Sequence, residues 1–244
     1  MPTDTAGSGA VTGISSMATR GLLAELAAEY RSRFGVSVAF DSVGGVEAAR
    51  RVRAGELVDV VVLASTAMEE LASQGHLLAG IRVDVARSPM AVAVGVGRPR
   101  PGLADAEAVR RAVLEGGRIG YSTGPSGDHL QRLLAEWGIA DRVGGRMVKA
   151  PPGIPVGTLV ARGEADLGFQ QLSELTGVDG IDIVGRLPPE LGTDTVFAAG
   201  VTAVSSRADE ARTFLAFLVS EEASGAKVRR GMEPFARRER AGSA

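Results

Sequence analysis

The chain has 244 residues, of which 45% are hydrophobic and 23% charged, and its formal net charge is -2. This length can bury one large core or two lobes of about 100–120 residues, and the near-neutral charge excludes a general attraction to nucleic acid or acidic membranes. The lack of cysteine excludes disulfides and thiolate catalysis, and only two histidines argue against a histidine-rich metal site.

Strands and helices alternate in the first part of the chain. Strands are predicted over 11–14, 36–42 and 58–64, and helices over 19–34, over a segment carrying Val46, Ala49 and Val52, and over 67–74. Gly35 is expected to end the first helix, and Ser65 and Thr66 to cap the third. The continuous apolar run 58–64 is typical of a parallel strand covered on both faces. Three strand–helix units in succession predict a parallel α/β sheet.

A second α/β set follows a change of lobe. Strands over 82–88 and 90–97 are predicted to carry the chain between lobes. Helices are then predicted over 105–114, 126–137, 156–163 and 171–175, and strands over 118–121, 146–148, 166–169 and 181–184. The strand over 195–204 is expected to return to the first lobe, before a helix over 208–220. We therefore predict a disordered leader 1–10, lobe 1 from 11–88, lobe 2 from 89–193, and a return to lobe 1 with a C-terminal tail over 194–244.

The N-terminal segment and the apolar runs of the sequence indicate in which cell compartment the protein is expected. The segment MPTDTAGSGA has no basic start and no apolar core, so it does not read as a secretory signal. No apolar run approaches the length of a membrane span. As written, the sequence predicts a cytoplasmic protein, or a periplasmic or extracellular one if a leader has been removed.

Small, hydroxyl-rich turns precede several of the predicted helices. They are GISSMATR over 13–20, Val43-Gly44-Gly45, Ser65-Thr66, and GYSTGPSGDHL over 120–130. In open α/β sheets ligands lie beyond the carboxyl ends of the strands, where helix N-termini offer N–H groups to an anion. The last turn lacks the GKS/T of a Walker A loop. Ordinary capping explains each turn alone, but their recurrence favours a shared anion site.

Particular residues are expected around that anion. They are Ser15, Ser16, Met17, Arg20, Gly44, Gly45, Ser65, Ser122, Thr123, Ser126, Pro152 and Gln170. His129 is a candidate catalytic base because it follows the largest turn and titrates near neutrality, a partly exposed structural histidine being the alternative. Asp41 and Glu47 flank the Gly44-Gly45 turn, and Glu47 is the second candidate base.

The layout resembles the type II periplasmic-binding-protein fold, specifically the molybdate-binding-protein-like superfamily, over about residues 11–235. The resemblance is carried by the Ser15-Ser16 turn, by Glu25-Leu26-Ala27, by RAGELVDVVVLAS over 53–65 and by VARGEADLGF over 160–169. A Gly-Glu pair followed by an aspartate and an apolar strand, present in both lobes, is typical of this superfamily. Molybdate binders tend to carry a tyrosine after the second of these strands, where this chain has Phe169-Gln170-Gln171.

With that departure, the chain looks like a member of a divergent branch that includes aconitate isomerase. The segments that carry this resemblance are GISSMATR, SVGGVEAARRV, GYSTGPSG, APPGIPVG and GFQQLSEL. The resemblance implies two lobes, each a mainly parallel sheet flanked by helices, with a ligand cleft between them. It further implies isomerisation of a small unsaturated polycarboxylate by allylic proton transfer, with no metal or organic cofactor.

Two other functions stay open. One is a non-catalytic binding protein that delivers an oxyanion or organic acid to an ABC importer, and the other is a cytosolic ligand-sensing module. The absence of a leader and of a lipidation cysteine favours the enzyme, and a sensing module would need a partner domain. In each case the expected partner is a small anion and not nucleic acid.

Overall fold

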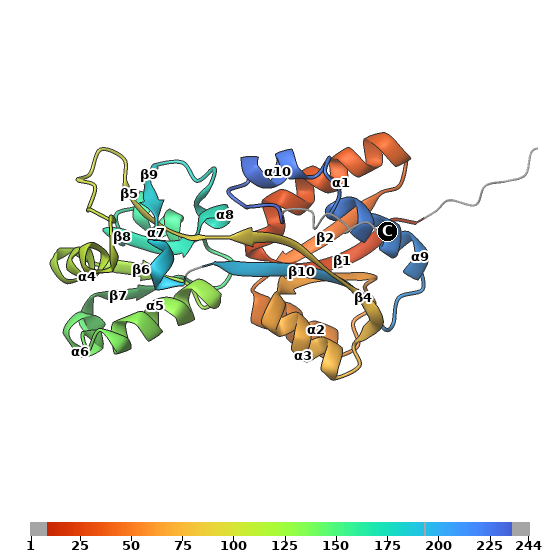
Figure 1. The fold of residues 1–244 in the computed structure, drawn as a ribbon, viewed down its shortest axis with the longest axis horizontal. Coiled ribbons are helices and arrows are strands. Elements are labelled where there is room, and N and C mark those ends of the chain that lie inside the picture. The colour runs from red at the N-terminus through yellow and green to blue at the C-terminus, as the bar shows by residue number, and fades with distance from the viewer. Residues whose placement is uncertain (1–8, 193, 236–244) are drawn as a thin grey trace, which may run out of the picture.

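The computed structural model describes residues 9–192 and 194–235, which form two lobes side by side (Figure 1). The strands of lobe 1 are β1 (Val11–Ser16), β2 (Val38–Val43), β3 (Val60–Ala64), β4 (Leu77–Ser88) and β10 (Thr195–Thr202). Those of lobe 2 are β5 (Met90–Gly95), β6 (Ile119–Tyr121), β7 (Met147–Lys149), β8 (Leu167–Gln171) and β9 (Ile181–Arg186). The predicted leader lies outside the described residues except for Gly9 and Ala10, as does the end of the predicted tail, 236–244.

Lobe 1 orders its strands β2-β1-β3-β10-β4. β1 pairs in parallel with β2 and β3, whereas β10 runs antiparallel to β3 and β4. Its helices are the 3-10 helix η1 (Met17–Thr19), α1 (Arg20–Phe34), α2 (Gly45–Arg53), α3 (Ser65–Ser73), α9 (Ala208–Leu218) and α10 (Ser224–Arg229). Consecutive β3 residues point to opposite faces, so Val60 and Val62 join the core with α1 and α9, while Val61 and Leu63 join the core with α2 and α3.

Lobe 2 orders its strands β7-β6-β8-β5-β9, with β6 parallel to β7 and β8, and β5 antiparallel to β8 and β9. Its helices are α4 (Ala106–Glu115), α5 (Pro125–Glu136), α6 (Ala140–Val143), η2 (Gly144–Arg146), α7 (Val156–Ala161), α8 (Leu172–Leu175) and η3 (Pro189–Leu191). Leu130 and Leu134, one helical turn apart on α5, pack with Phe169 of β8 in one core. α7 supplies a smaller core through Val156, Leu159 and Val160.

Both sheets are mixed because the chain crosses between lobes. β4 of lobe 1 leads through Ser88–Met90 into β5 of lobe 2, and β10 returns to lobe 1 after η3. Each arriving strand is inserted between two strands of its new sheet and runs against both. β10 thus joins the sheet of lobe 1, and the other four strands of each sheet share one direction.

A third connection between the lobes comes from the C-terminal segment. The Glu233 backbone pairs with that of Arg87 at 2.7 and 2.9 Å, beside β4, and its carboxylate forms an ion pair with Arg186 of β9. Nearby, the Ser88 hydroxyl donates to Ser173 of α8 at 3.1 Å. These contacts hold the lobes together on the crossing side.

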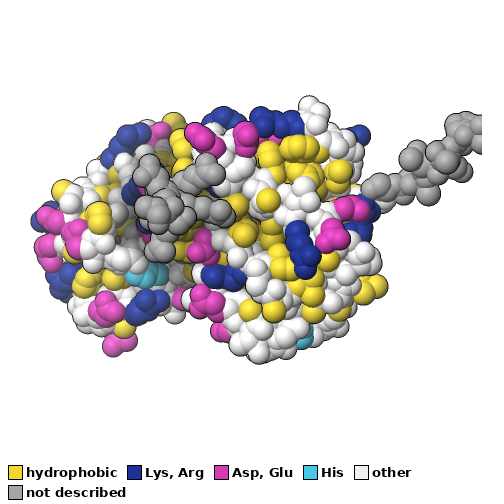
Figure 2. Space-filling model, turned by 45° about the vertical axis from the view of Figure 1, so that its right-hand side comes forward, with side chains coloured by type: hydrophobic (Ala, Val, Ile, Leu, Met, Phe, Trp, Pro, Cys, Tyr) yellow, Lys and Arg dark blue, Asp and Glu magenta, His cyan; other side chains and the backbone are white. Residues whose placement is uncertain are grey.

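Most element boundaries match the sequence expectation within a few residues. The strand expected over 82–88 begins earlier, at Leu77, and the short helices α6 and α10 were not expected. Basic and acidic side chains are interspersed over the face in Figure 2, as the near-neutral charge predicts.

Within residues 9–192 and 194–235, no helix combines the length and apolar character needed to span a membrane.

Candidate functional site

The carboxyl ends of the parallel strands in both lobes meet at the boundary between the lobes. β1, β2 and β3 lead into η1, α2 and α3, while β6 and β8 lead into α5 and α8. α8 of lobe 2 packs against η1 of lobe 1, and the starts of α3 and α5 line one pocket. Of the turns that sequence analysis singled out, Ser65-Thr66 and the turn before α5 therefore face one another across a cleft, as open α/β sheets favour.

An inter-lobe pocket of about 470 Å³ lies at one end of this cleft. Both lobes and the second crossing contribute polar side chains, among them Ser65, Thr66, Ser126, His129, Arg132 and Thr195. Three residues expected at the site, Ser65, Ser126 and His129, are thus brought together from distant parts of the chain. The volume is in the range of small-molecule sites.

The helices that open at the cleft begin without side-chain caps. The N-cap residues of α1, α2, α3 and α5 are Thr19, Gly44, Ala64 and Gly124, and none of them forms a side-chain capping bond. In α4, Asp105 accepts a 2.7 Å bond from the Ala108 amide, whereas α6, α9 and α10 also begin without a side-chain cap. The cleft helices therefore keep first-turn N–H groups that a cap would otherwise satisfy, and these suit an anion.

The expected capping by Ser65 and Thr66 is accordingly wrong. β3 runs without a break into α3, so Ala64 takes the cap position and Ser65 is the first helical residue. The Ser65 hydroxyl instead bonds to the Arg82 guanidinium at the edge of the pocket.

The turn before α5 is braced by its own side chains. The Ser122 and Ser126 hydroxyls lie 3.1 Å apart, and the Gly124 amide donates to Ser122 at 3.3 Å. Gly127 packs so closely that a Cβ there would lie 1.8 Å from the Ser122 carbonyl oxygen. This glycine lets the chain turn tightly, with Ser126 buried at the pocket and Thr123 exposed on the turn.

His129 is held as a neutral base inside the pocket. Burial lowers its pKa below 6.5, a bond to the Leu191 backbone opposes this, and nearby Arg132 lowers it further. Nε2 is buried without a hydrogen-bond partner in the described chain, so the bond to the Leu191 carbonyl uses the other ring nitrogen. A neutral imidazole fixed in this way keeps an unused lone pair on Nε2, an atom that is itself buried.

The other end of the cleft is formed by the residues that follow β1. Ser15 is fully buried and its hydroxyl pairs with that of Ser42 at 2.9 Å. The Ser16 hydroxyl is buried without a partner among the described residues, and Gly45 lies beside it. Met17 begins η1, the element that meets α8.

Residues at the end of β8 complete this side of the cleft. The side-chain oxygen Oε1 of Gln170 accepts a 2.7 Å bond from the backbone amide of Val156, at the start of α7. The Gln171 amide donates to the Thr195 hydroxyl at 2.6 Å, while Gln171 Oε1 is buried without a partner in the described chain. Glu174, in α8, accepts from the Gln170 side chain, and burial raises its pKa to about 7.

Gln171 and Glu174 were not selected from the sequence. Their position directly after an apolar strand that ends at the cleft is the signal that could have found them.

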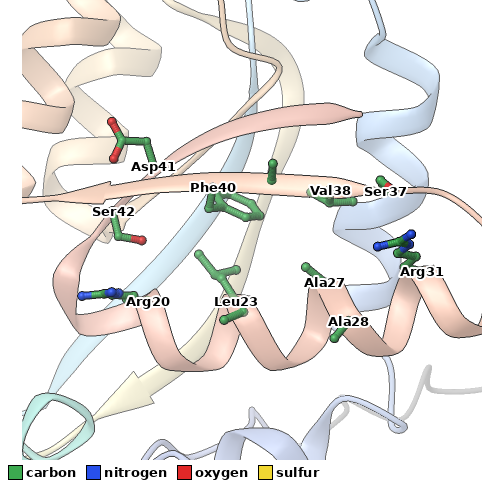
Figure 3. A pocket seen from close by; sticks show the side chains of 12 residues that line it. Arg20, Leu23, Ala27, Ala28, Arg31, Ser37, Val38, Phe40, Asp41 and Ser42 are labelled. Carbon is green, nitrogen blue, oxygen red and sulfur yellow. The ribbon is translucent and has the colours of Figure 1, made fainter. Parts of the chain in front are cut away.

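Arg20, Glu47 and Pro152 lie away from the pocket. Arg20 is exposed and lines a separate groove of about 660 Å³ between α1 and the edge strand β2 (Figure 3). Glu47 is exposed and forms an ion pair with Arg50 at 2.6 Å, and the bond from Arg50 lowers its pKa, which weakens it as a base. Pro152 is exposed in the turn before α7.

Within the described ranges, no three acidic or histidine side chains gather as metal ligands do.

The family model for bacterial extracellular solute-binding proteins matches residues 11–233. The chain belongs to this family. It is 34% identical over 229 residues to an aconitate isomerase from a Pseudomonas species. The aligned region covers 92% of this chain and 87% of that relative. The chain is thus an aconitate isomerase homologue within a solute-binding family, as the sequence resemblance implied.

Solved structures show the same two-lobed fold. The periplasmic molybdate-binding protein of Azotobacter vinelandii aligns with a TM-score of 0.77 at 22% identity, covering 91% of this chain and 98% of that one. The substrate-binding domain of a putative molybdenum ABC transporter from Clostridium difficile aligns with a TM-score of 0.72 at 17% identity, covering 93% and 99%. The predicted type II periplasmic-binding-protein fold is therefore confirmed.

Proposed function

We propose that the protein is an isomerase of a small unsaturated tricarboxylate, which interconverts cis- and trans-aconitate by allylic proton transfer in the inter-lobe cleft. The observation that carries this proposal is the 34% identity to an aconitate isomerase across 92% of the chain. The site adds support of its own, because uncapped helix N-termini and a neutral histidine suit a polycarboxylate and a proton transfer.

Binding falls to groups that donate hydrogen bonds. First-turn N–H groups of α2, α3 and α5 are offered to carboxylates, and Arg132 adds a full positive charge. Ser65 and Ser126 line the pocket, and their hydroxyls can exchange their bonds to Arg82 and Ser122 for bonds to the substrate. Fixing the carboxylates on both sides of the reacting carbons holds them in one geometry, which is where much of the acceleration of such a step arises. The same donors stabilise negative charge that moves onto a carboxylate as the proton leaves.

His129 is the proposed proton acceptor. Nε2 takes a proton from the methylene carbon, the C–H electron pair forms the new double bond, and the former vinyl carbon receives a proton. The single bond between the methylene carbon and the central carbon becomes the new double bond. Rotation about this bond before the proton is removed decides whether the product is cis or trans. No oxidant or other reactant is consumed.

A second candidate function is transport. The matched family is described as extracellular, which favours an exported protein that hands a small anion to an ABC importer. In that case the cleft binds the anion without turnover, and the protein works outside the cytoplasm.

The deciding experiment is proton NMR of cis-aconitate and of trans-aconitate with the purified protein in D2O. Interconversion by the wild type is expected, and His129→Gln should slow it by about 100-fold or more. His76→Gln, which changes the chain's other histidine, is the matched control and should leave the rate unchanged. If the wild type gives no interconversion while aconitate or molybdate raises its melting temperature, the transport function replaces the isomerase.

A further inference from the structure

The groove between α1 and β2 is separate from the inter-lobe pocket. Its volume is about 660 Å³, against about 470 Å³ for that pocket, and its lining residues differ from those of the pocket. The wall on the α1 side is formed by Leu23, Ala24, Ala27 and Ala28, and Phe40 of β2 stands opposite them (Figure 3). Because three of these helix residues are alanines, α1 leaves room for side chains from another chain.

β2 offers an unpaired backbone edge beside this groove. It is the end strand of the lobe 1 sheet, and β1 is its pairing partner in the described chain. The Val11 amide of β1 donates to the Ser37 carbonyl at 2.9 Å. Since successive residues of a strand point their backbone groups to opposite sides, the N–H and C=O groups of Val38, Phe40 and Ser42 point out of the sheet. A further strand can pair with them.

The side chains of these three residues share the face of the sheet that α1 covers. Val38 and Phe40 pack against the core of lobe 1, and the Phe40 ring lies 5.9 Å from that of Phe214 in α9. Ser42 lines the groove near its Arg20 end (Figure 3). A strand added beside β2 would therefore extend the sheet along α1 and turn every second side chain towards the groove.

The groove carries positive charge at both ends. Arg20 and Arg31 of α1 lie at its opposite ends (Figure 3). Both are exposed, and neither side chain forms an ion pair within residues 9–192 and 194–235. Asp41 of β2 does not neutralise them, because its carboxylate points away from the groove and pairs with Arg51 of α2 at 2.5 Å. The groove thus holds two cations that are available to an acidic partner.

The acidic residues of α1 face a different element. Glu25 forms ion pairs with Arg229 and Arg230 of α10 at 2.7 and 2.5 Å. Glu29 lies 3.5 Å from Arg229. α1 therefore presents carboxylates to α10 and guanidinium groups to the groove. A second copy of this chain, pairing β2 with β2, would bring its own groove arginines against these, so like charges oppose that arrangement.

We propose that the groove binds an extended, acidic segment of a partner protein, which adds to β2 as a sixth strand of the lobe 1 sheet. Backbone pairing supplies the affinity in this mode of recognition, and alternate side chains supply the specificity. This partner site lies beyond the function proposed above and does not depend on it.

The spacing of the arginines defines the segment. Arg20 and Arg31 are about 16 Å apart along the helix axis. Residues four positions apart in a strand share a face and lie about 13 Å apart. Two acidic residues at this spacing can each meet one arginine, since the arginine side chains are long enough to lean inward. The residue midway between them lies over Ala24 and Ala27, where an aliphatic side chain fits. The expected pattern is acidic-x-aliphatic-x-acidic.

The test measures binding of a fluorescent, end-blocked heptapeptide, TETVTET, to the whole protein at low ionic strength. Binding should saturate and weaken as salt is added, and TQTVTQT should bind about 10-fold more weakly. Arg20→Gln and Arg31→Gln should each weaken TETVTET binding about 2- to 5-fold, and the double variant about 10-fold. Arg33→Gln changes an exposed arginine of α1 outside the groove, so this matched control should bind as the wild type does.

N-methylated peptides separate strand addition from a contact between charges alone. Methyl groups on one alternating set of peptide amides remove the N–H groups that face β2, whereas those on the other set point away from it. One of the two methylated peptides should therefore lose binding and the other should keep most of it. Which of them binds then tells whether the added strand runs parallel or antiparallel to β2.

Several results overturn the proposal. They are the absence of saturable binding, equal binding of TETVTET and TQTVTQT, equal effects of the two methylation patterns, and a loss in Arg33→Gln as large as in Arg31→Gln. Displacement of the peptide by aconitate would place it in the inter-lobe cleft instead. A dimer in light scattering that dissociates when the peptide is added would assign the groove to a second copy of the chain. Loss of isomerase activity has no bearing on these outcomes.

Discussion

Glu174→Gln should stabilise the ligand-free protein by an amount that grows with pH. Burial raises the pKa of Glu174 from 4.5 to about 7 in the folded state. The folded protein therefore binds this proton more tightly than the unfolded chain, and the stability it provides at low pH is lost as the pH rises from 4.5 to about 7. Glutamine keeps a polar side chain beside Gln170 but does not titrate.

The size of the effect follows from the shift in pKa. A difference of about 2.5 units corresponds to about 3 kcal/mol at pH 8, and the same linkage gives about 1 kcal/mol at pH 5. For a chain of this length, ~3 kcal/mol raises the melting temperature by roughly 6–12 °C.

Urea unfolding of wild type and variant at pH 5, 6.5 and 8 measures the difference. Glu115→Gln, which changes an exposed glutamate of α4, is the matched control and should show no such trend. A stability difference that stays constant with pH, or that shrinks towards pH 8, would refute the raised pKa of Glu174 in the folded protein.

Three further outcomes are expected. Ser126→Ala should raise KM for aconitate about 10-fold with kcat nearly unchanged, since it removes a pocket hydroxyl and its bond to Ser122; a change confined to kcat would contradict this. Gly127→Ala should lower the free energy of unfolding by about 2 kcal/mol or more, because its Cβ would overlap the Ser122 carbonyl. Thermal unfolding measures this, and an unchanged melting temperature would contradict it. Glu47→Gln should leave turnover within twofold of wild type, since Glu47 is an exposed partner of Arg50, and a large loss would return it to the site.

The fold was predictable where apolar residues recur with a clear period. The apolar run 58–64 predicts a strand covered on both faces, and the side chains of β3 do pack alternately into two cores. The first half of β4, from Leu77, escaped prediction because Gly80 interrupts it and its side chains are only partly buried. Its strand character depends on β10, more than a hundred residues later, and no local pattern contains that information.

The candidate pocket was predictable only where its residues follow strand ends. Ser65, Ser126 and His129 line one pocket because each follows a strand that ends at the cleft. Adjacency to a turn does not fix where a longer side chain points, and Arg20 and Glu47 accordingly lie elsewhere. The altered acidity of Glu174 depends on uncharged residues from four other elements, which only the folded chain brings together.

The insertion of β10 between β3 and β4 governs the order in which the protein can be assembled during synthesis. β4 joins its sheet through β10, so lobe 1 is unfinished until residues 195–202 have left the ribosome. Lobe 2 draws all its strands from the continuous segment 90–186 and needs no later residue for its sheet. The lobe that begins first is therefore completed last, and until then β3 and β4 expose edges that a chaperone or a neighbouring nascent chain can reach.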